Sequence, residues 1–231
     1  MLNQFSRSEL IFGKRAAEVL SNARIAVFGL GGVGGYVVEA LARMGVGALD
    51  IVDNDTINIT NINRQIIALH STLGQKKTDV FEKRILDINP NCTVTKHDMF
   101  YLPENAEDID LSVYGYVVDA IDTVSAKIDI ALRCASLGVP IISSMGTGNK
   151  KDPTMLKVSD IYSTKVCPLA RVMRRELKKR DVPALKVVYS EEIPTIDGEE
   201  RTPGSTPFVP PACGLIIASE VIKDILSENE V

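Results

Sequence analysis

The chain has 231 residues, of which 45% are hydrophobic and 24% are charged, and its formal net charge is −4. This composition is typical of a globular protein with a sizeable core, and the mild acidity argues weakly against a dedicated nucleic-acid binder. The four cysteines form no C-x-x-C pair, which argues against a structural zinc site and a disulfide framework. A signal peptide and a long apolar run are missing, so we expect a cytoplasmic protein with no integral membrane segment.

The first half of the chain alternates short apolar runs with helical patterns. Residues 24–28 predict a buried strand, the glycine-rich GLGGVGG follows at once, and residues 36–45 carry apolar side chains on one helical face. The elements expected next are a strand over 48–53, a helix over 75–88, a strand over 92–97, a strand over 116–119, a helix over 124–137 that ends at Gly138, and a strand over 139–143. This alternation predicts an α/β, Rossmann-like, doubly wound fold, whose mostly parallel sheet has helices on both faces.

The pattern becomes looser after Gly148. The expected elements are a strand over 156–162, a helix rich in Arg and Lys over 168–180, a long polar loop over 190–212 and an apolar helix over 214–226. No linker divides the chain. We therefore predict a single domain over residues 1–231, with a nucleotide-binding core at 1–148 and a second part at 149–231 that carries the basic helix, the loop and the C-terminal helix.

The glycine-rich turn indicates a nucleotide site. Gly29, Gly31 and Gly34 form G-x-G-x-x-G between a predicted strand and a predicted helix, with Gly32 inside the motif. Such glycines let the backbone approach a phosphate, and the start of the helix offers free N–H groups. Asp53 ends the next strand, where a carboxylate accepts hydrogen bonds from a ribose hydroxyl. The motif alone does not separate NAD, FAD and ATP, and a glycine-rich turn in another α/β sheet is the plainer alternative.

A polar segment after Asp53 offers groups that neutralise phosphate charge. Its residues are Asp55, Asn58, Asn61, Asn63, Arg64 and Gln65, followed by Lys77 at a helix start and by Asp122 after the fourth strand. Carboxylates suit a ribose or a metal, amides suit phosphate oxygens, and a guanidinium binds phosphate through two hydrogen bonds. Attack of a carboxylate on an α-phosphate needs such neutralisation of the transition state and of the leaving pyrophosphate. Taken singly, each Asn or Asp is equally typical of a turn.

The motif order resembles that of the ThiF-type adenylyltransferases, the relatives of ubiquitin-activating enzymes. GLGGVG, D-x-D, N-x-N-R-Q, GQxK and DAID follow one another in residues 5–145. By position, the resemblance implies that ATP is bound by Gly29, Gly31, Gly32, Gly34, Asp53, Asp55, Asn61, Arg64, Gln65, Lys77 and Asp122. It further implies that Asp53 holds the ribose and that Asp122 holds Mg²⁺ together with the ATP phosphates. Catalytic roles are implied for Arg64, Lys77 and Asp122, and for Arg7, which would reach the ATP of the partner subunit in a homodimer.

Three branches of this family compete. Ubiquitin-activating enzymes use a catalytic cysteine and extra domains, and sulfur-carrier adenylyltransferases usually carry two C-x-x-C pairs, but this chain has neither the size nor the pairs. INRQIIALHSTLGQKK, VVDAIDT, residues 151–180 and FVPPACGLIIASEVI resemble the third branch, the tRNA threonylcarbamoyladenosine dehydratases, over nearly the whole chain.

The third branch implies an ATP-dependent cyclisation of threonylcarbamoyladenosine in tRNA, through adenylation of the threonyl carboxylate. An intramolecular attack of this kind needs no protein nucleophile. The main alternative is an adenylyltransferase that activates the C-terminus of a ubiquitin-like sulfur-carrier protein. A nicotinamide-dependent dehydrogenase and a non-catalytic nucleotide sensor are further alternatives.

The basic helix is the predicted contact with tRNA. Arg171, Arg174, Arg175 and Lys178 are spaced three and four residues apart, so they share a helical face that suits a phosphate backbone. A solvated helix is the alternative.

Cys167 precedes the basic helix, where a thiolate is favoured. We interpret it as a structural cysteine rather than a covalent or sulfur-relay residue, which leaves a sulfur-relay partner protein open. Both histidines are weak catalytic candidates. We expect His97 to be structural, whereas His70 could line the site.

Overall fold

A seven-stranded sheet organises the molecule in the computed structural model, which describes residues 2–195 and 203–231. The strands are β1 (Arg24–Phe28), β2 (Ala48–Val52), β3 (Thr93–His97), β4 (Tyr116–Asp119), β5 (Ile141–Ser144), β6 (Leu156–Asp160) and β7 (Lys186–Ser190). Their order across the sheet is β3-β2-β1-β4-β5-β7-β6. Every neighbouring pair is parallel except β6 and β7, which are antiparallel. The predicted mostly parallel, Rossmann-like sheet is confirmed.

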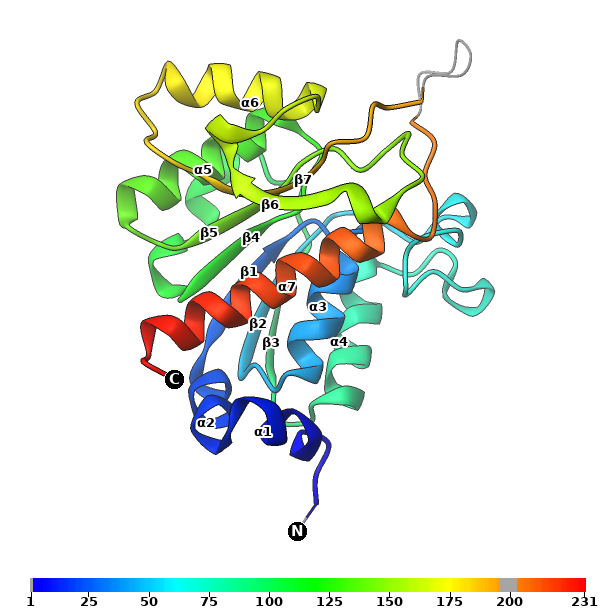
Figure 1. Ribbon diagram of the computed structural model, residues 1–231. Helices are drawn as coiled ribbons and strands as arrows, with labels where there is room; N and C mark the ends of the chain where they lie inside the picture. The colour runs from blue at the N-terminus through cyan, green and yellow to red at the C-terminus, as the bar shows by residue number, and fades with distance from the viewer. Residues whose placement is uncertain (1, 196–202) are drawn as a thin grey trace.

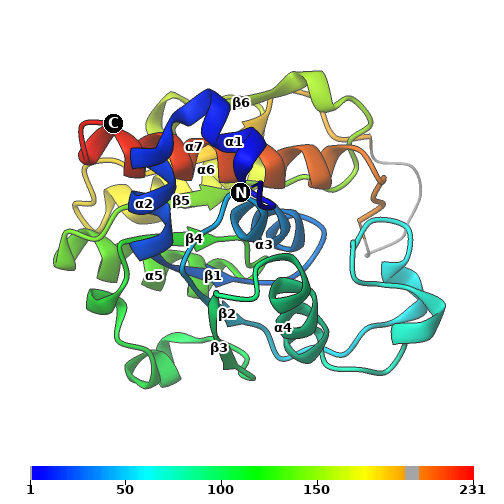
Figure 2. The ribbon, with the colours of Figure 1, turned by 90° about the horizontal axis from the view of Figure 1, so that it is seen from below.

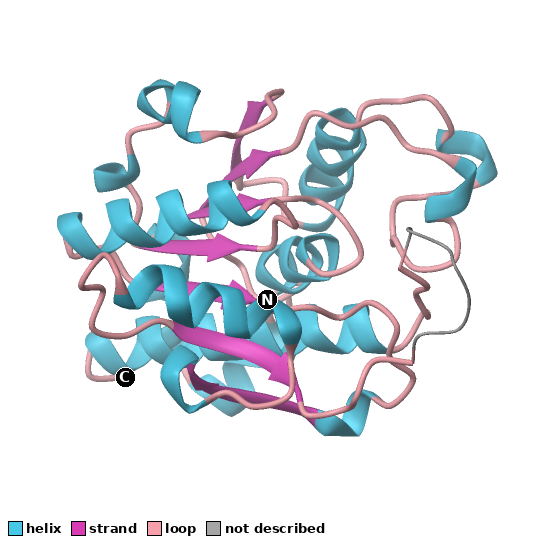
Figure 3. Cartoon of the chain, turned by 90° about the horizontal axis from the view of Figure 1, so that it is seen from above, coloured by secondary structure: helices cyan, strands magenta, loops and turns pink. Residues whose placement is uncertain are grey.

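Helices cover both faces of this sheet (Figures 1 and 3). One face carries α3 (Gly34–Arg43), α4 (Lys77–Ile88) and α7 (Val209–Glu228). Their apolar residues share one core with the side chains of β1 and β2 that point toward these helices. The other face carries α5 (Val124–Leu137) and α6 (Pro168–Lys178), which pack through a separate cluster that includes Ala131 and Met173. Within the described residues, every helix is too short or too polar to span a bilayer.

Two short helices precede the sheet, and the sequence patterns did not predict them. They are α1 (Ser6–Phe12) and α2 (Lys14–Asn22), which Figure 2 shows side by side near the end of α7. Ala16 and Leu20 anchor α2 in the core, whereas α1 buries no residue at all. On α1, the side chains of Leu10 and Ile11 are 87% and 79% exposed. This helix therefore presents an apolar surface outward.

The C-terminal half differs from its prediction at two elements. Strand β7 was not predicted, and it inserts between β5 and β6, so the sheet continues past residue 148. The last helix begins at Val209 rather than at Gly214. Pro210 and Pro211 fit in its first turn because the N–H groups there have no partner within the helix. The predicted loop at 190–212 is therefore shorter, and its residues 196–202 lie outside the described part of the chain.

A buried carboxylate ties the three strands at one side of the sheet together. Asp50 on β2 is 1% exposed and accepts two hydrogen bonds from Arg24 on β1, at 2.9 and 3.0 Å. Tyr114 donates to it at 3.1 Å, and the His97 ring on β3 lies 3.4 Å away. Burial alone would raise the pKa of the Asp50 carboxyl, but hydrogen bonds from His97 and Arg24 lower it to about 2. This environment is consistent with the structural role expected for His97.

Candidate active site

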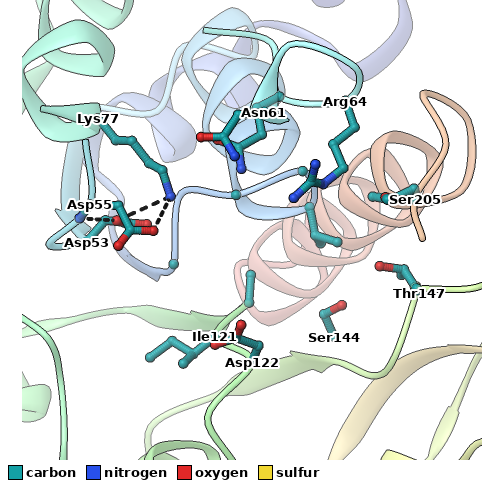
Figure 4. A pocket seen from close by; sticks show the side chains of 18 of the residues that line it. Asp53, Asp55, Asn61, Arg64, Lys77, Ile121, Asp122, Ser144, Thr147 and Ser205 are labelled. Carbon is teal, nitrogen blue, oxygen red and sulfur yellow. Dashed lines mark hydrogen bonds and ion pairs between the residues drawn. The ribbon is translucent and has the colours of Figure 1, made fainter. Parts of the chain in front are cut away.

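A cleft opens where the parallel strands end at their carboxyl edge. It has a volume of about 610 Å³ and is lined from both sides (Figure 4). The first wall is formed by the glycine-rich loop after β1, the end of β2, the crossover between β2 and α4, and the loop after β4. The second wall is formed by the loop after β5 and by residues 203–205 and Pro210, which precede and begin α7. Ligand sites of open α/β sheets lie at this edge.

Close packing in the glycine-rich loop leaves no room for a side chain at two of its glycines. Gly29 has φ +87°, and a Cβ there would lie 2.7 Å from the carbonyl oxygen of Ala120. At Gly34, a Cβ would lie 1.8 Å from the carbonyl oxygen of Gly29, so no other residue fits the first turn of α3. At Gly32, a Cβ would lie 3.1 Å from Pro210 and 3.3 Å from the stem of Arg64. Gly29, Gly31 and Gly32 line the cleft, whereas Gly34 supports the loop from behind.

Asp53 connects the glycine-rich loop with the start of the crossover. Its Oδ2 atom accepts a hydrogen bond from the backbone N–H of Leu30 at 2.7 Å, and its Oδ1 atom accepts one from Asp55 at 2.8 Å. The ribose contact expected for Asp53 stays a prediction, and a carboxylate has lone pairs for more than these two partners.

Lys77 carries a nearly buried positive charge at the same corner of the cleft. Its side chain is 5% exposed, and Nζ lies 2.7 Å from Asp55 Oδ2 and 3.5 Å from Asp53 Oδ1 (Figure 4). Because the two carboxylates surround the ammonium group, it is fixed in place at the first turn of α4. The corner therefore offers a preorganised cation to an anionic ligand.

Two amides of the crossover face the cleft from the same wall. Asn61 Oδ1 accepts the N–H of Asn58 at 3.0 Å, so the amide nitrogen of Asn61 is the end that can donate to a ligand. Gln65 is buried, and its Oε1 atom lies without a hydrogen-bond partner among the described residues. A buried acceptor without a partner is costly. Gln65 Oε1 is therefore an acceptor to which a bound ligand could donate a hydrogen bond.

Arg64 extends from the crossover toward the middle of the cleft (Figure 4). Its Nη1 atom donates to the carbonyl oxygen of Thr60 at 2.9 Å and to Asn63 Oδ1 at 2.8 Å. Among the described residues, none accepts a hydrogen bond from Nε or Nη2. These two nitrogens form the edge of the guanidinium that can bind an anion through two parallel bonds.

A buried charge pair holds the loop that carries Asp122. Asp119 at the end of β4 and Lys127 on α5 are both fully buried, and their charged atoms lie 2.9 Å apart. Ser143 donates to the same carboxylate oxygen at 2.6 Å, and the N–H of Ile121 donates to the other oxygen at 3.2 Å. Asp122 itself is exposed and lines the cleft (Figure 4). Asp119 and Lys127 were not predicted as site residues, although a lysine on an apolar helical face was a usable signal in the sequence.

The residues of the second wall were not predicted from the sequence either. Ser144, Thr147 and Ser205 contribute hydroxyl groups to it, and Leu169 and Pro203 contribute apolar surface. This wall brings together the loop after β5, the start of α6 and the chain before α7. The cleft is consequently larger than the nucleotide motifs alone suggested.

The remaining predicted site residues lie outside this cleft. Arg7 is exposed on α1 and does not line the cleft of its own chain. On α6, Arg171, Arg175 and Lys178 are exposed, but Arg174 donates to the carbonyl oxygen of Thr164 at 2.9 Å and so is directed at its own chain. Arg175 also pairs with Glu176, at 2.9 Å.

The cysteines and His70 do not face the cleft. Cys167 is 1% exposed at the start of α6, and all four cysteines are buried. This burial supports the structural interpretation of Cys167. His70 lies exposed in a short 3-10 turn and does not line the cleft.

Comparison with known proteins assigns the chain to a class that this fold and cleft fit. The chain matches the ThiF family over residues 5–231, and it belongs to that family. It is similar to the tRNA threonylcarbamoyladenosine dehydratase of Bacillus subtilis, with 42% identity over 100% of this chain and 98% of the relative. Its fold is also similar to that of Escherichia coli tRNA N6-threonylcarbamoyladenosine dehydratase, TcdA, solved in complex with ATP, with a TM-score of 0.92 and 34% identity. That match covers 98% of this chain and 95% of the solved chain. Escherichia coli MccB shares the fold alone, with a TM-score of 0.70 and 19% identity over 97% of this chain and 65% of the solved one.

The change Lys127→Met is expected to lower the free energy of unfolding by about 3–5 kcal/mol, because it leaves the Asp119 carboxylate buried without its cation. Urea denaturation of both proteins at neutral pH measures the difference. Lys83→Met on the exposed side of α4 is the control, with an expected change within about 0.5 kcal/mol. A change below about 1 kcal/mol at Lys127 would contradict this account of the pair.

Proposed function

We propose that the protein catalyses the ATP-dependent dehydration, and thereby the cyclisation, of threonylcarbamoyladenosine in tRNA. The observation that carries this proposal is a single cleft that Lys77 and Arg64 both line and that continues into a second wall bearing hydroxyl groups. The similarity to dehydratases over nearly the full length of both chains supports the choice of substrate. The sulfur-carrier alternative is not favoured, because the relatives that match over the full length carry the dehydratase name.

The chemistry that we propose balances without a protein nucleophile. An oxygen of the threonyl carboxylate attacks the α-phosphorus of ATP, and the bond to pyrophosphate breaks. The neighbouring carbamoyl group then attacks the activated carbonyl carbon, a ring closes and AMP leaves. The net change is loss of one water from the modified nucleoside and conversion of ATP to AMP and pyrophosphate. Arg64 and Lys77 stabilise the charge that builds on the phosphates, and ring closure benefits from the high effective concentration of an intramolecular attack.

ATP fits the first wall of the cleft on two observations. The glycine-rich loop leaves a cradle that any Cβ at Gly29 or Gly34 would destroy, and the buried Gln65 Oε1 atom lacks a donor among the described residues. Mg²⁺ would be held by Asp122, which is exposed and lines the cleft, together with the ATP phosphates. When bound, Mg²⁺ supplies charge neutralisation to the phosphates.

We also propose a cytoplasmic homodimer in which Arg7 completes the site of the partner subunit. The exposed Leu10 and Ile11 on α1 support this assembly, because an apolar helix surface next to Arg7 is best covered by another chain. The position of Arg7, outside the cleft of its own chain, is consistent with a contribution to another subunit.

The tRNA backbone is proposed to lie along α6. Arg171, Arg175 and Lys178 present exposed charges there, whereas Arg174 contributes chiefly by holding the Thr164 loop against the helix. The start of α6 brings Leu169 into the second wall, so tRNA on this helix would lie next to the cleft. A sulfur-relay partner gains no support from the buried Cys167.

Incubation with ATP and Mg²⁺ is expected to remove the mass of one water from threonylcarbamoyladenosine in tRNA, because adenylation makes AMP the leaving group. Mass spectrometry of the digested nucleosides measures this change. The Arg64→Ala protein is expected to act about 100-fold more slowly or worse, since a preorganised charge is lost, while Lys83→Ala outside the cleft keeps the wild-type rate. An unchanged nucleoside with intact wild-type protein, or wild-type rates in Arg64→Ala, would contradict the proposal.

The double change Arg171→Glu and Lys178→Glu is expected to weaken tRNA binding and to lower the slope of log affinity against log salt by about two, one for each lost phosphate contact. Fluorescence anisotropy with labelled tRNA at several salt concentrations gives this slope. The pair Lys83→Glu and Lys223→Glu changes the net charge equally on other helices and serves as the control. Equal slopes for the two double variants would remove α6 from the tRNA contact.

A further inference from the structure

The two walls of the cleft are linked by the side chain of Asn63. Its Oδ1 atom accepts a hydrogen bond from Arg64 Nη1 at 2.8 Å, and its Nδ2 atom donates to the carbonyl oxygen of Ser205 at 3.0 Å. The guanidinium can only donate and the carbonyl can only accept, so the orientation of the Asn63 amide is fixed by its partners. Asn63 does not itself line the cleft. It joins Arg64 to the segment of the second wall that carries Ser205.

The bond to Asn63 determines which edge of Arg64 faces the cleft. Thr60 and Asn63 together use both N–H groups of Nη1. The stem of Arg64 also lies close to the glycine-rich loop, since a Cβ at Gly32 would come within 3.3 Å of it. With both N–H groups of Nη1 engaged, the guanidinium presents Nε and Nη2 to a ligand. Loss of Asn63 would leave Nη1 with a single acceptor and allow the group to turn.

The segment that Asn63 holds is a built wall rather than a loose loop. Asn149 has φ +57°, and its N–H donates to the carbonyl oxygen of Gly204 at 2.8 Å, while the N–H of Gly204 donates back to Asn149 Oδ1 at 2.6 Å. A Cβ at Gly148 would lie 2.9 Å from Pro203. Residues 203–205 of the second wall are thus held by hydrogen bonds with both Asn149 and Asn63. Because Ser205 is held in place, its carbonyl oxygen fixes Asn63, and Asn63 in turn fixes the orientation of Arg64.

We propose that Asn63 is a positioning residue that sets Arg64 for phosphate binding and couples occupation of the nucleotide half to the 203–205 wall. The proposal rests on the proposed function only in taking ATP as the ligand. When the guanidinium binds phosphate, its Nη1 atom is held against Asn63 Oδ1, and Asn63 Nδ2 is held against Ser205. ATP binding therefore stiffens residues 203–205, so the second wall becomes more rigid once the nucleotide is in place.

The first test measures ATP affinity by calorimetry in four proteins: wild type, Asn63→Ala, Arg64→Ala and the double variant. Asn63→Ala is expected to weaken ATP binding about ten-fold, because a charge-assisted bond that orients Arg64 is lost. In the Arg64→Ala background the same change is expected to have no further effect, since Asn63 acts through Arg64. Asn91→Ala, which removes an exposed amide outside the cleft, is the control. Wild-type affinity in Asn63→Ala, or a ten-fold effect that persists without Arg64, would overturn the proposal.

The second test follows amide hydrogen exchange in the peptide that covers residues 203–209. ATP is expected to slow exchange there in the wild type but not in Asn63→Ala, while protection of the glycine-rich loop remains in both. Asn63→Asp keeps an acceptor for Arg64 but loses the donor to Ser205, so it is expected to lose the same protection. Protection of 203–209 that survives both changes would overturn the coupling. Neither test uses tRNA. If the protein does not dehydrate the modified tRNA, that result contradicts the proposed function but does not change the outcome of these two tests.

Discussion

The carboxylate of Asp53 is the interaction on which the nucleotide half of the cleft depends. It joins the end of β2 to the loop after β1 through Leu30, and it orders Asp55 and the ammonium group of Lys77. One side chain therefore fixes the glycine-rich loop and the nearby cation at once. A Rossmann-type strand pair places this carboxylate where it can do so, because β1 and β2 are adjacent and end at the same edge.

Buried charges stabilise the other parts of the site. The Asp119–Lys127 pair holds the loop that presents Asp122, and Asp50 with Arg24 fixes the strands that support Asp53. Such groups are expensive to bury alone but are retained here as hydrogen-bonded pairs. In contrast, the residues that face the cleft remain partly exposed, as Arg64 and Asp122 are. The fold thus separates charges that position the site from charges that remain for ligands.

Local patterns predicted the nucleotide half of the molecule well. The strand, glycine turn and helix around Gly29–Gly34 follow from short-range sterics and periodicity, and Tyr116–Asp119 and Val124–Leu137 have the predicted bounds. The second wall was beyond such reasoning, because it depends on contacts between Asn149, Asn63 and residues 203–205, which are far apart in sequence. Helical spacing placed Arg174 on the basic face, but it could not show that the Thr164 loop covers that side chain.

Carboxylate adenylation is the central claim, and the fate of a carboxylate oxygen tests it most directly. The reaction would be run for a single turnover on tRNA whose threonyl carboxylate carries ¹⁸O, and AMP and inorganic phosphate would be analysed by mass spectrometry. Attack on the α-phosphorus predicts that one labelled oxygen leaves with AMP, because the bond from carbon to that oxygen breaks when the ring closes. Label in inorganic phosphate, with ADP rather than AMP as the nucleotide product, would show activation by the γ-phosphate and would contradict the account.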